Sequence, residues 1–204
     1  YIILTILALT CILPIMLLFF NSIKPQEEFG INPFGFPLSI RLENFVDAWI
    51  MGEYAQIFLN STKLVIGTLI LNLTVSGLAG FSLAKLYPRG SNAFLVYLLV
   101  GVAIPAQMFI LPLFLLWKEL GLMNTHLGLI IIYAGLNAPF ATFLIRSYMI
   151  QLPDELFDAA KIDGANTLQL FYRIALPISW PVFLTTGLVV GLAVWNEFLF
   201  ALTF

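Results

Sequence analysis

Five long stretches with almost no charged side chains constrain this chain more than any other feature of its sequence. They cover residues 2–20, 64–84, 93–117, 127–145 and about 178–200. A helix needs about 20 apolar residues to cross the hydrocarbon core of a membrane. Lipid offers the backbone no hydrogen-bond partners, so each stretch is predicted to be a helix. The apolar runs are continuous and do not alternate, which argues against a β-barrel.

The composition agrees with a membrane protein. Only 10% of the residues are charged, whereas a soluble domain has about 25%. The sequence therefore predicts an all-α membrane protein, a polytopic helical bundle with five visible spans. The net charge of −2 offers no basic surface for nucleic acid, and the single cysteine, Cys11, cannot form an internal disulfide. Both ends lie within apolar runs and the first residue is not methionine, so we expect a fragment of a longer protein, truncated at both ends.

The connecting segments fall alternately on two sides of the membrane. Residues 21–63 and 118–126 share one side, and residues 85–92 and 146–173 share the other. The basic residues are Lys24, Arg41, Lys63 and Lys118 on the first side, and Lys85, Arg89, Arg146, Lys161 and Arg173 on the second. Cytoplasmic loops carry an excess of lysine and arginine. Because the second side is shorter but holds more of these residues, it is predicted to be cytoplasmic.

The outer segment 21–63 divides into two parts. Residues 24–39 are rich in proline and glycine and should be irregular. Residues 41–58 place apolar side chains mostly at helical spacing, with polar residues between them. We expect this second part to form an amphipathic helix on the outer face of the membrane.

The segment LPDELFDAAKIDGANTLQLFYRIALP, residues 152–177, is a long charged stretch between two apolar runs. Pro153 suits the first turn of a helix, where its missing N–H costs nothing. Gly164 is where this helix is expected to end, because glycine accepts a left-handed backbone. Asn166 or Thr167 can cap a second helix that stops at Pro177. The sequence therefore predicts a helix, a glycine turn and a second helix.

The first of these two helices has about ten residues, and so short a helix is marginal in water by itself. Ala159 and Ala160 give it a flat patch for close approach by another backbone, and Phe157 and Ile162 offer apolar anchors. Two interpretations are open at this point. The helix either packs only against the ends of its own bundle, or it docks a cytoplasmic partner.

The pattern DAAKIDGANTLQLFYRIALP resembles the cytoplasmic EAA loop found in the membrane subunits of ABC importers. That family shows an acidic residue before two alanines, a glycine four residues after the second alanine, and Ile-x-Leu-Pro further on. The matching residues are Asp158, Ala159, Ala160, Gly164, Ile174, Leu176 and Pro177. Aspartate replaces the commoner glutamate at 158. Residues 60–61, 87–90, 104–114 and 195–204 further resemble the carbohydrate-type permeases, particularly the MalG-like subunit.

The resemblance implies a type I ABC importer permease fold, which usually has six spans. It implies one transmembrane permease domain over residues 1–204, with the coupling loop at 146–177. In that family the loop contacts an ATP-hydrolysing subunit, and the residues implied here are Phe157, Asp158, Ala159, Ala160, Ile162, Gly164 and Ala165. The implied function is ATP-driven, binding-protein-dependent import of sugars. The implied partners are an ATP-binding cassette subunit dimer, a homologous second permease, an extracytoplasmic solute-binding protein and the bilayer of the prokaryotic inner membrane.

The chain itself is not expected to be an enzyme or to bind a cofactor. None of its 14 glycines is followed by lysine, so it contains no phosphate-binding P-loop, and ATP is expected to be used by the partner subunit. An intramembrane enzyme would need a catalytic pair such as Ser–His or two aspartates, and the spans contain neither histidine nor aspartate. The only histidine, His126, is expected in the short outer loop. Two alternatives stay open: a scaffold or assembly protein without its own substrate, and a related permease for a non-sugar solute such as glycerol phosphate.

Polar side chains within the apolar runs are candidates for the path of a solute, because such groups are costly in lipid and often mark substrate routes. The candidates are Gln107, Asn137, Asn196 and Glu197, with Asn72 and Ser76 as further polar residues. Uncharged amides and aromatic faces would suit a neutral, hydroxylated solute. The alternative for each residue is hydrogen bonding between helices. Asn72, Ser76 and Gly80 share one helix face, which favours helix packing for these three.

Overall fold

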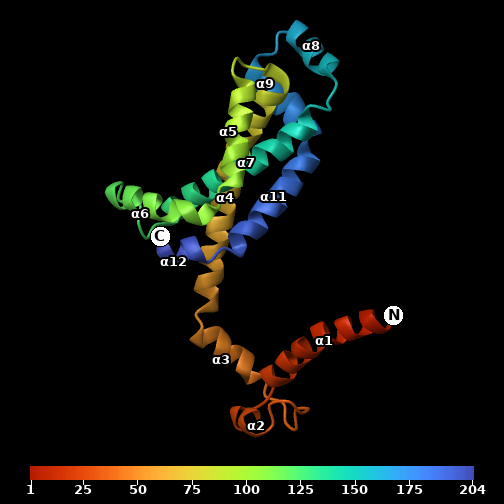
Figure 1. Ribbon diagram of the computed structural model, residues 1–204, viewed down its shortest axis with the longest axis vertical. Coiled ribbons are helices and arrows are strands. Elements are labelled where there is room, and N and C mark those ends of the chain that lie inside the picture. Colours follow the sequence, from red (N-terminus) through yellow and green to blue (C-terminus); the bar gives the residue numbers. More distant parts are fainter. The chain divides into compact units, whose positions relative to one another are not determined.

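The computed structural model describes all residues, 1–204, and consists of helices and their connections (Figure 1). The all-α prediction is therefore confirmed. The chain divides into two compact units, Tyr1–Leu59 and Asn60–Phe204.

The first unit contains α1 (Ile2–Ser22), α2 (Gln26–Ile31) and α3 (Glu43–Met51). The helix α1 covers the first predicted span and is long and apolar enough to cross a membrane. The proline- and glycine-rich segment is not wholly irregular, because α2 lies within it. Proline at the position before this helix and two acidic residues in its first turn explain this, since both favour a helix start.

The segment between α1 and α3 is held by polar side chains that bind its backbone. The ammonium of Lys24, only 2% exposed, donates to the carbonyls of Asn32 at 2.7 Å and Gly35 at 2.8 Å. The carboxylate of Glu28 accepts from the backbone N–H of Leu38 at 2.7 Å. This hydrogen bond lowers the pKa of Glu28, because it favours the charged form.

The predicted amphipathic helix over 41–58 is wrong as a single element. The helix α3 ends at Met51, and α4 (Tyr54–Phe81) begins three residues later. Glu53 between them takes a left-handed backbone, with φ at 49°, which breaks the helical hydrogen bonding. The rings of Trp49 and Tyr54 stack across this break, with their centroids 6.0 Å apart.

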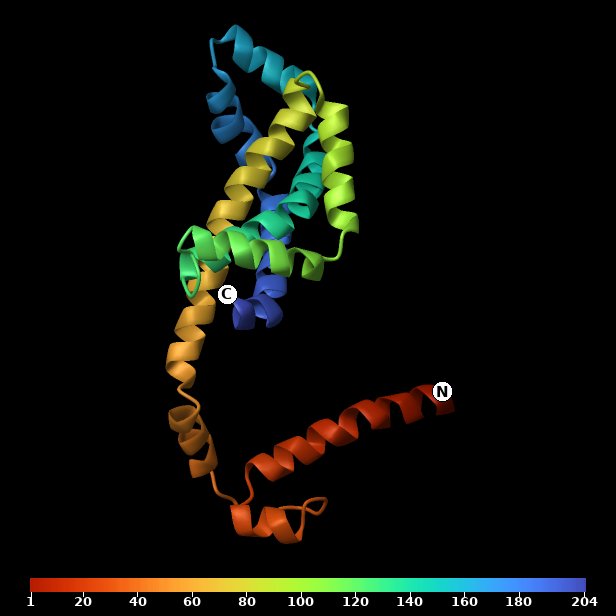
Figure 2. The same cartoon turned by 60° about the vertical axis from the view of Figure 1, so that its left-hand side comes forward.

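The second unit is a bundle in which α7 (His126–Met149) packs against α4, α5 (Ser91–Ala103) and α11 (Trp180–Trp195) (Figure 2). The helices α4 and α7 cover two further predicted spans and are each long and apolar enough to cross a membrane. His126, expected in the short outer loop, is instead the first residue of α7, where Thr125 caps the helix through its side chain.

The predicted single span over 93–117 is broken. The helix α5 ends at Ala103, and the 3-10 turn η2 (Ala106–Phe109) and α6 (Ile110–Glu119) follow. The segment Ala106–Glu119 is bent by 96° from α5. Pro105 explains the break, because it has no N–H and disfavours helical geometry in the residue before it. Ile104 is accordingly extended.

The end of the chain is also divided. The helix α9 (Thr167–Leu170), the π-turn η3 (Phe171–Ala175) and α10 (Leu176–Ile178) precede a 78° bend, after which α11 begins. The expected stop at Pro177 is one residue from the observed end: this proline is tolerated early in α10, and the helical segment ends at Ile178, directly before the bend. The run predicted over 178–200 becomes α11 and α12 (Leu199–Thr203). Three helices can thus span a membrane unbroken, or up to five if each bent pair counts as one span.

Two buried clusters hold the second unit together. One joins the ends of α4 and α7 to the segment that follows α7, and consists of Phe81, Ala84, Ile145, Met149, Phe157, Leu170, Phe171, Ala175, Val182 and Phe183. We call it the loop-end cluster. The other joins α6, α7, α11 and α12, and includes Trp117, Leu129, Tyr133, Val190 and Phe200.

Candidate functional site

The charged segment forms the helix-turn-helix that its sequence predicts. The helix α8 (Asp154–Ile162) follows Pro153 directly, with Asp154 and Glu155 in its first turn near the positive end of the helix dipole. Gly164 ends this helix in a left-handed conformation, with φ at 83°. The N–H of Ala165 donates to the carbonyl of Ala160 at 2.9 Å, as in a helix end of this type.

A reciprocal cap starts the next helix. The side-chain oxygen of Asn166 accepts from the N–H of Gln169 at 2.9 Å, and the side-chain oxygen of Gln169 accepts from the N–H of Asn166 at 2.8 Å. Of the two caps that the sequence offered, the structure therefore uses Asn166. With both helix ends satisfied, α8 and α9 have a fixed geometry at the turn between them.

One side of α8 packs against its own bundle. The ring of Phe157 is 3% exposed and lies 6.1 Å, centroid to centroid, from the ring of Phe81. Ala160 and Ala165 pack against the same loop-end cluster. Three of the seven residues assigned to a partner contact thus face inward, so their side chains position α8.

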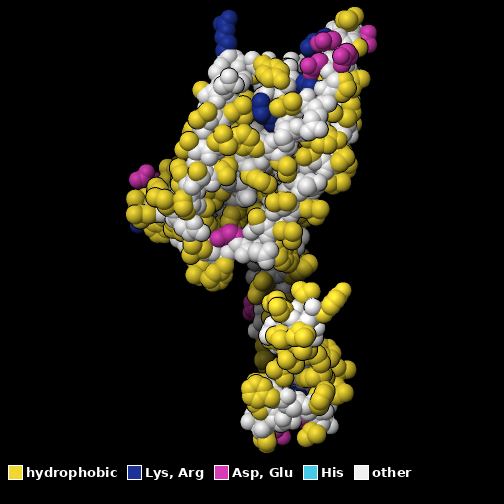
Figure 3. All heavy atoms as spheres, turned by 45° about the vertical axis from the view of Figure 1, so that its right-hand side comes forward, with side chains coloured by type: hydrophobic (Ala, Val, Ile, Leu, Met, Phe, Trp, Pro, Cys, Tyr) yellow, Lys and Arg dark blue, Asp and Glu magenta, His cyan; other side chains and the backbone are white.

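The other side of α8 is exposed, and Figure 3 shows charged side chains gathered at this end of the unit above a largely hydrophobic body. Asp158, Ala159, Ile162 and Gly164 are the remaining predicted residues on this surface. Ile162 is 87% exposed, which is costly for an isolated apolar side chain in water. We call these four residues the α8 outer face.

Lys85 connects α8 to the end of α4, and sequence reasoning missed this. Its ammonium donates to the carbonyl of Leu152 at 2.6 Å and to a carboxylate oxygen of Asp154 at 2.6 Å. The ammonium also lies 5.2 Å from the ring centroid of Phe157. No spacing rule relates residues this far apart in the chain, so only the fold brings them together.

The polar residues of α4 serve helix packing, as their spacing predicted. The amide of Asn72 donates to the carbonyl of Ala134 on α7 at 2.9 Å, and the hydroxyl of Ser76 donates to the carbonyl of Ala138 at 3.3 Å. A methyl group added at Gly80 would lie 3.1 Å from a side-chain carbon of Ile145. Small and polar residues on one face therefore let α4 and α7 approach closely.

Three of the four path candidates, Asn137, Asn196 and Glu197, have hydrogen-bond partners within the protein. The amides of Asn137 and Asn196 donate within their own helices, to the carbonyls of Tyr133 and Leu192, both at 2.8 Å. Gln107 lies exposed in the turn η2.

Glu197 has a clear structural use. Its carboxylate accepts from the hydroxyl of Tyr133 at 2.7 Å and from the N–H groups of Phe200 at 3.0 Å and Ala201 at 3.2 Å. The last two bonds satisfy donors at the start of α12, and the first ties α12 to α7.

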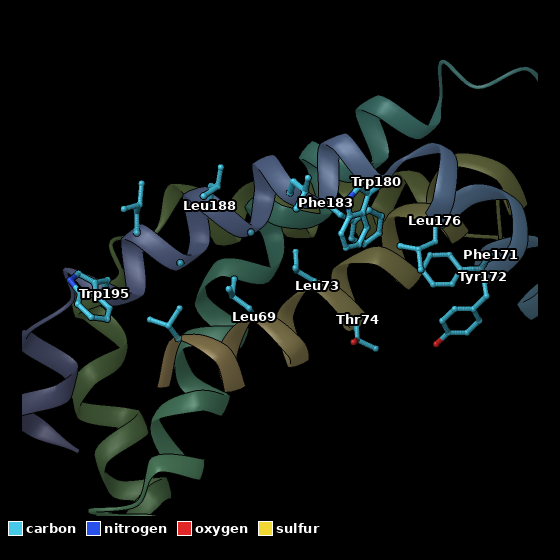
Figure 4. A pocket seen from close by; sticks show the side chains of 15 residues that line it. Leu69, Leu73, Thr74, Phe171, Tyr172, Leu176, Trp180, Phe183, Leu188 and Trp195 are labelled. Atoms are coloured by element: carbon cyan, nitrogen blue, oxygen red, sulfur yellow. The ribbon is translucent and has the colours of Figure 1, made fainter. Parts of the chain in front are cut away.

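A groove of about 610 Å³ runs between α4 and α11 (Figure 4). Trp195 lies at one end, and Phe171 and Tyr172 lie at the other. Thr74 and Tyr172 carry the only hydroxyl groups in the lining. The other lining residues are apolar or aromatic, and two are glycines. Such a lining suits a hydrophobic surface and offers few partners to a hydroxylated solute.

Apolar helices with close interhelical packing, together with a capped and charged helix-turn-helix at one end, define an integral membrane protein of the multi-pass class. Residues 73–204 match the family model described as "Binding-protein-dependent transport system inner membrane component". The match covers more than half of the chain, which therefore belongs to this family and is a multi-pass inner-membrane protein of the ABC importer permease fold.

Several named proteins are similar to this chain. The probable ABC transporter permease protein YurM of Bacillus subtilis is 34% identical over 191 residues, which cover 94% of this chain and 63% of the relative. The diacetylchitobiose uptake system permease protein NgcG of Streptomyces coelicolor is 32% identical over 92% of this chain and 62% of its own length. The arabinooligosaccharides transport system permease protein AraQ of Halalkalibacterium halodurans is 34% identical over 96% of this chain and 71% of the relative.

A solved structure shares the fold. The crystal structure of a bacterial ABC transporter involved in the import of the acidic polysaccharide alginate contains a chain that superposes with a TM-score of 0.76 at 25% identity. The superposition covers 96% of this chain and 69% of that chain. The chain spans less than two thirds of the length of YurM and NgcG, so it corresponds to part of such a permease.

Proposed function

We propose that this chain is part of the membrane-spanning permease subunit of an ATP-driven, binding-protein-dependent importer of oligosaccharides. The observation that carries the proposal is the construction of α8. The helix is fixed to the bundle through Phe157, while Ile162 and the rest of the α8 outer face are turned to the surroundings. A helix that is held on one side, and that exposes charged side chains together with the apolar Ile162 on the other, is suited to a protein partner.

The partner that α8 would meet is a cytoplasmic ATPase subunit. In this proposal ATP binds only to that partner, and closure of an ATPase dimer displaces α8. A second permease subunit would complete the transport path, and an extracytoplasmic binding protein would deliver the solute. A ligand can shift a two-state equilibrium only through its different affinity for the two states. The loaded binding protein and ATP would therefore both have to bind more tightly to the same arrangement of the spans.

The oligosaccharide assignment rests on the relatives and on the charge of the spans. NgcG and AraQ are named for the uptake of diacetylchitobiose and arabinooligosaccharides. The solved structure that shares the fold belongs to a transporter involved in the import of an acidic polysaccharide. A charged oligosaccharide is therefore the second candidate among sugar substrates. The helices α4, α5 and α7 carry no charged residue in their central parts, which suits a neutral sugar better than a phosphorylated one.

The test uses the full-length protein, purified with its native ATPase, partner permease and binding protein and reconstituted in proteoliposomes. Uptake is measured with labelled diacetylchitobiose, arabinotriose, an alginate oligosaccharide and glycerol phosphate. We expect ATP-dependent uptake of a neutral oligosaccharide and stimulation of ATP hydrolysis by the loaded binding protein. Uptake of glycerol phosphate alone would overturn the sugar assignment. Copurification without an ATPase, together with uptake of none of these solutes, would favour the scaffold alternative. Uptake that ignores ATP would overturn the ATP-driven mechanism.

A further inference from the structure

The buried ammonium of Lys85 holds together three parts of the chain at the end of the bundle that carries α8. Lys85 belongs to the π-turn η1 (Ser82–Leu86), which ends α4. The groups that it contacts lie elsewhere: the carbonyl of Leu152 in the segment after α7, and the carboxylate of Asp154 and the ring of Phe157 in α8. One side chain thus bonds α4 to α8 directly.

The burial of this ion pair is unequal. The side chain of Lys85 is 5% exposed, whereas that of Asp154 is 76% exposed. An ammonium removed from water needs its donors satisfied, because desolvation of an ion is costly. Two donors of Lys85 bind oxygen atoms, and the charge lies against the face of an aromatic ring, which attracts cations. These three contacts therefore fix the position of the Lys85 ammonium.

A second contact lies one turn earlier on the same helix. The ring of Phe81 in α4 packs against the ring of Phe157. This contact alone would leave α8 free to pivot about the ring pair, because apolar contacts are not directional. The bonds of Lys85 to Leu152 and Asp154 are directional and fix the start of α8.

We propose that Lys85 is a positioning residue that makes α8 and α4 move as one body when α8 is displaced. This inference rests on the proposed function, since it needs an ATPase that moves α8. The bonds of Lys85 matter because this residue lies in η1, and π-type hydrogen bonding is rare and marks irregular points in helices. Without these bonds, we infer that this turn deforms and that α4 stays behind when α8 moves.

The first test measures how firmly α8 is held to α4. Spin labels are placed at Val75 and at the exposed Leu156 of α8 in the full-length protein, after Cys11 and any further native cysteine are replaced by serine, and distances are recorded in the assembled transporter. We expect one narrow distance in the parent protein, with and without a non-hydrolysable ATP analogue. Lys85→Met keeps the length of the side chain but removes the cation, and should broaden the distance and let the analogue shift it. Arg89→Met, a loss of an exposed cation close by, is the matched control and should leave the distance narrow.

The second test measures coupling with the sugar that the proteoliposome experiment identifies. For Lys85→Met we expect about fivefold or more ATP hydrolysed per sugar delivered, with basal ATP hydrolysis unchanged. Asp154→Asn changes an exposed group and should not disturb folding; we expect a smaller effect of about twofold on the same ratio. Glu155→Gln, its matched control in the same turn of α8, should leave the ratio unchanged.

The two proposals can fail separately. A narrow, analogue-independent distance and a normal ATP-to-sugar ratio in Lys85→Met would overturn the role of Lys85 while leaving the importer proposal intact. If Lys85→Met does not assemble, an unchanged ATP-to-sugar ratio in Asp154→Asn, for which a rise of about twofold is expected, overturns the same role. If the parent transporter takes up no sugar with ATP, the importer proposal fails, and the Lys85 role, which needs an ATPase that moves α8, falls with it.

Discussion

At the scale of single residues, Gly164 matters because it adopts the left-handed backbone conformation that ends α8. Its φ of 83° ends α8, and a side chain added there would meet no atom within 4 Å. A substitution therefore acts through the backbone and not through a clash. Non-glycine residues pay about 1–2 kcal/mol for a left-handed conformation, with asparagine tolerating it best.

We expect Gly164→Val to lose ATP-driven uptake while the protein still inserts and assembles, because the end of α8 must leave its left-handed geometry. Gly164→Asn is the matched control and should retain most of the uptake. The measurements are uptake in proteoliposomes and the amount of ATPase that copurifies. Normal uptake in the valine variant would contradict a coupling role for this turn.

Glu197 is a second residue for which the structure separates two roles. Its carboxylate bonds Tyr133 and two N–H groups of α12, so a structural role predicts effects on stability. We expect Glu197→Gln to lower the free energy of unfolding by about 1 kcal/mol and Glu197→Ala by about 2 kcal/mol. Uptake per folded molecule should be unchanged for Glu197→Gln, as thermal unfolding and transport assays on the same preparation can show. A loss of uptake at unchanged stability would instead place Glu197 in the solute path.

At the scale of elements, the close contact of α4 with α7 depends on Gly80, which has no side chain to separate the two helices. A methyl group at Gly80 would lie 3.1 Å from a side-chain carbon of Ile145 and 3.2 Å from the backbone nitrogen of Arg146. The backbone cannot yield as a flexible side chain can. We expect Gly80→Ala to destabilise the bundle by about 1–3 kcal/mol.

Gly135→Ala in α7 is the matched control for Gly80→Ala. A methyl group at Gly135 would meet nothing within 4 Å, so alanine should be neutral or stabilise the helix by up to about 1 kcal/mol. Unfolding midpoints in detergent compare the two variants. Equal unfolding midpoints would show that the close approach of α4 and α7 at Gly80 does not contribute to stability.

The accuracy of sequence-based prediction also differs by element. The helix α8, its stop at Gly164 and a cap at Asn166 or Thr167 could be predicted because each depends on residues close in the chain, and the structure selects Asn166. The break at Pro105 was missed because membrane helices often keep a proline with only a kink, and local sequence does not say which outcome a neighbouring helix imposes.

The site residues follow the same division. The exposed side of α8 could be inferred from its motif, whereas the inward orientation of Phe157 depends on where α4 ends. The link from Lys85 to Asp154 joins residues 69 positions apart, and its only sequence signal is that both are charged and next to apolar runs.

At the scale of the whole molecule, function depends on which side of the membrane α8 faces. The helix α7 has 24 residues, and at about 1.5 Å per residue this length exceeds the hydrocarbon core of about 30 Å. Its two ends should therefore lie on opposite sides. The basic residues near α8 predict that this end lies in the cytoplasm, where an ATPase could reach it.

We expect Asp163→Cys, in a Cys11→Ser background, to react with a membrane-impermeant maleimide only in inside-out vesicles, and Glu119→Cys to react only in intact cells from outside. Gly135→Cys, in the middle of α7, should react in neither preparation, because lipid and protein shield it. Labelling of positions 119 and 163 from one side would mean that α7 does not cross the membrane. Labelling of position 163 only from outside would place α8 beyond the reach of any ATPase, and the importer mechanism would fail even if every contact of α8 with the bundle is correct.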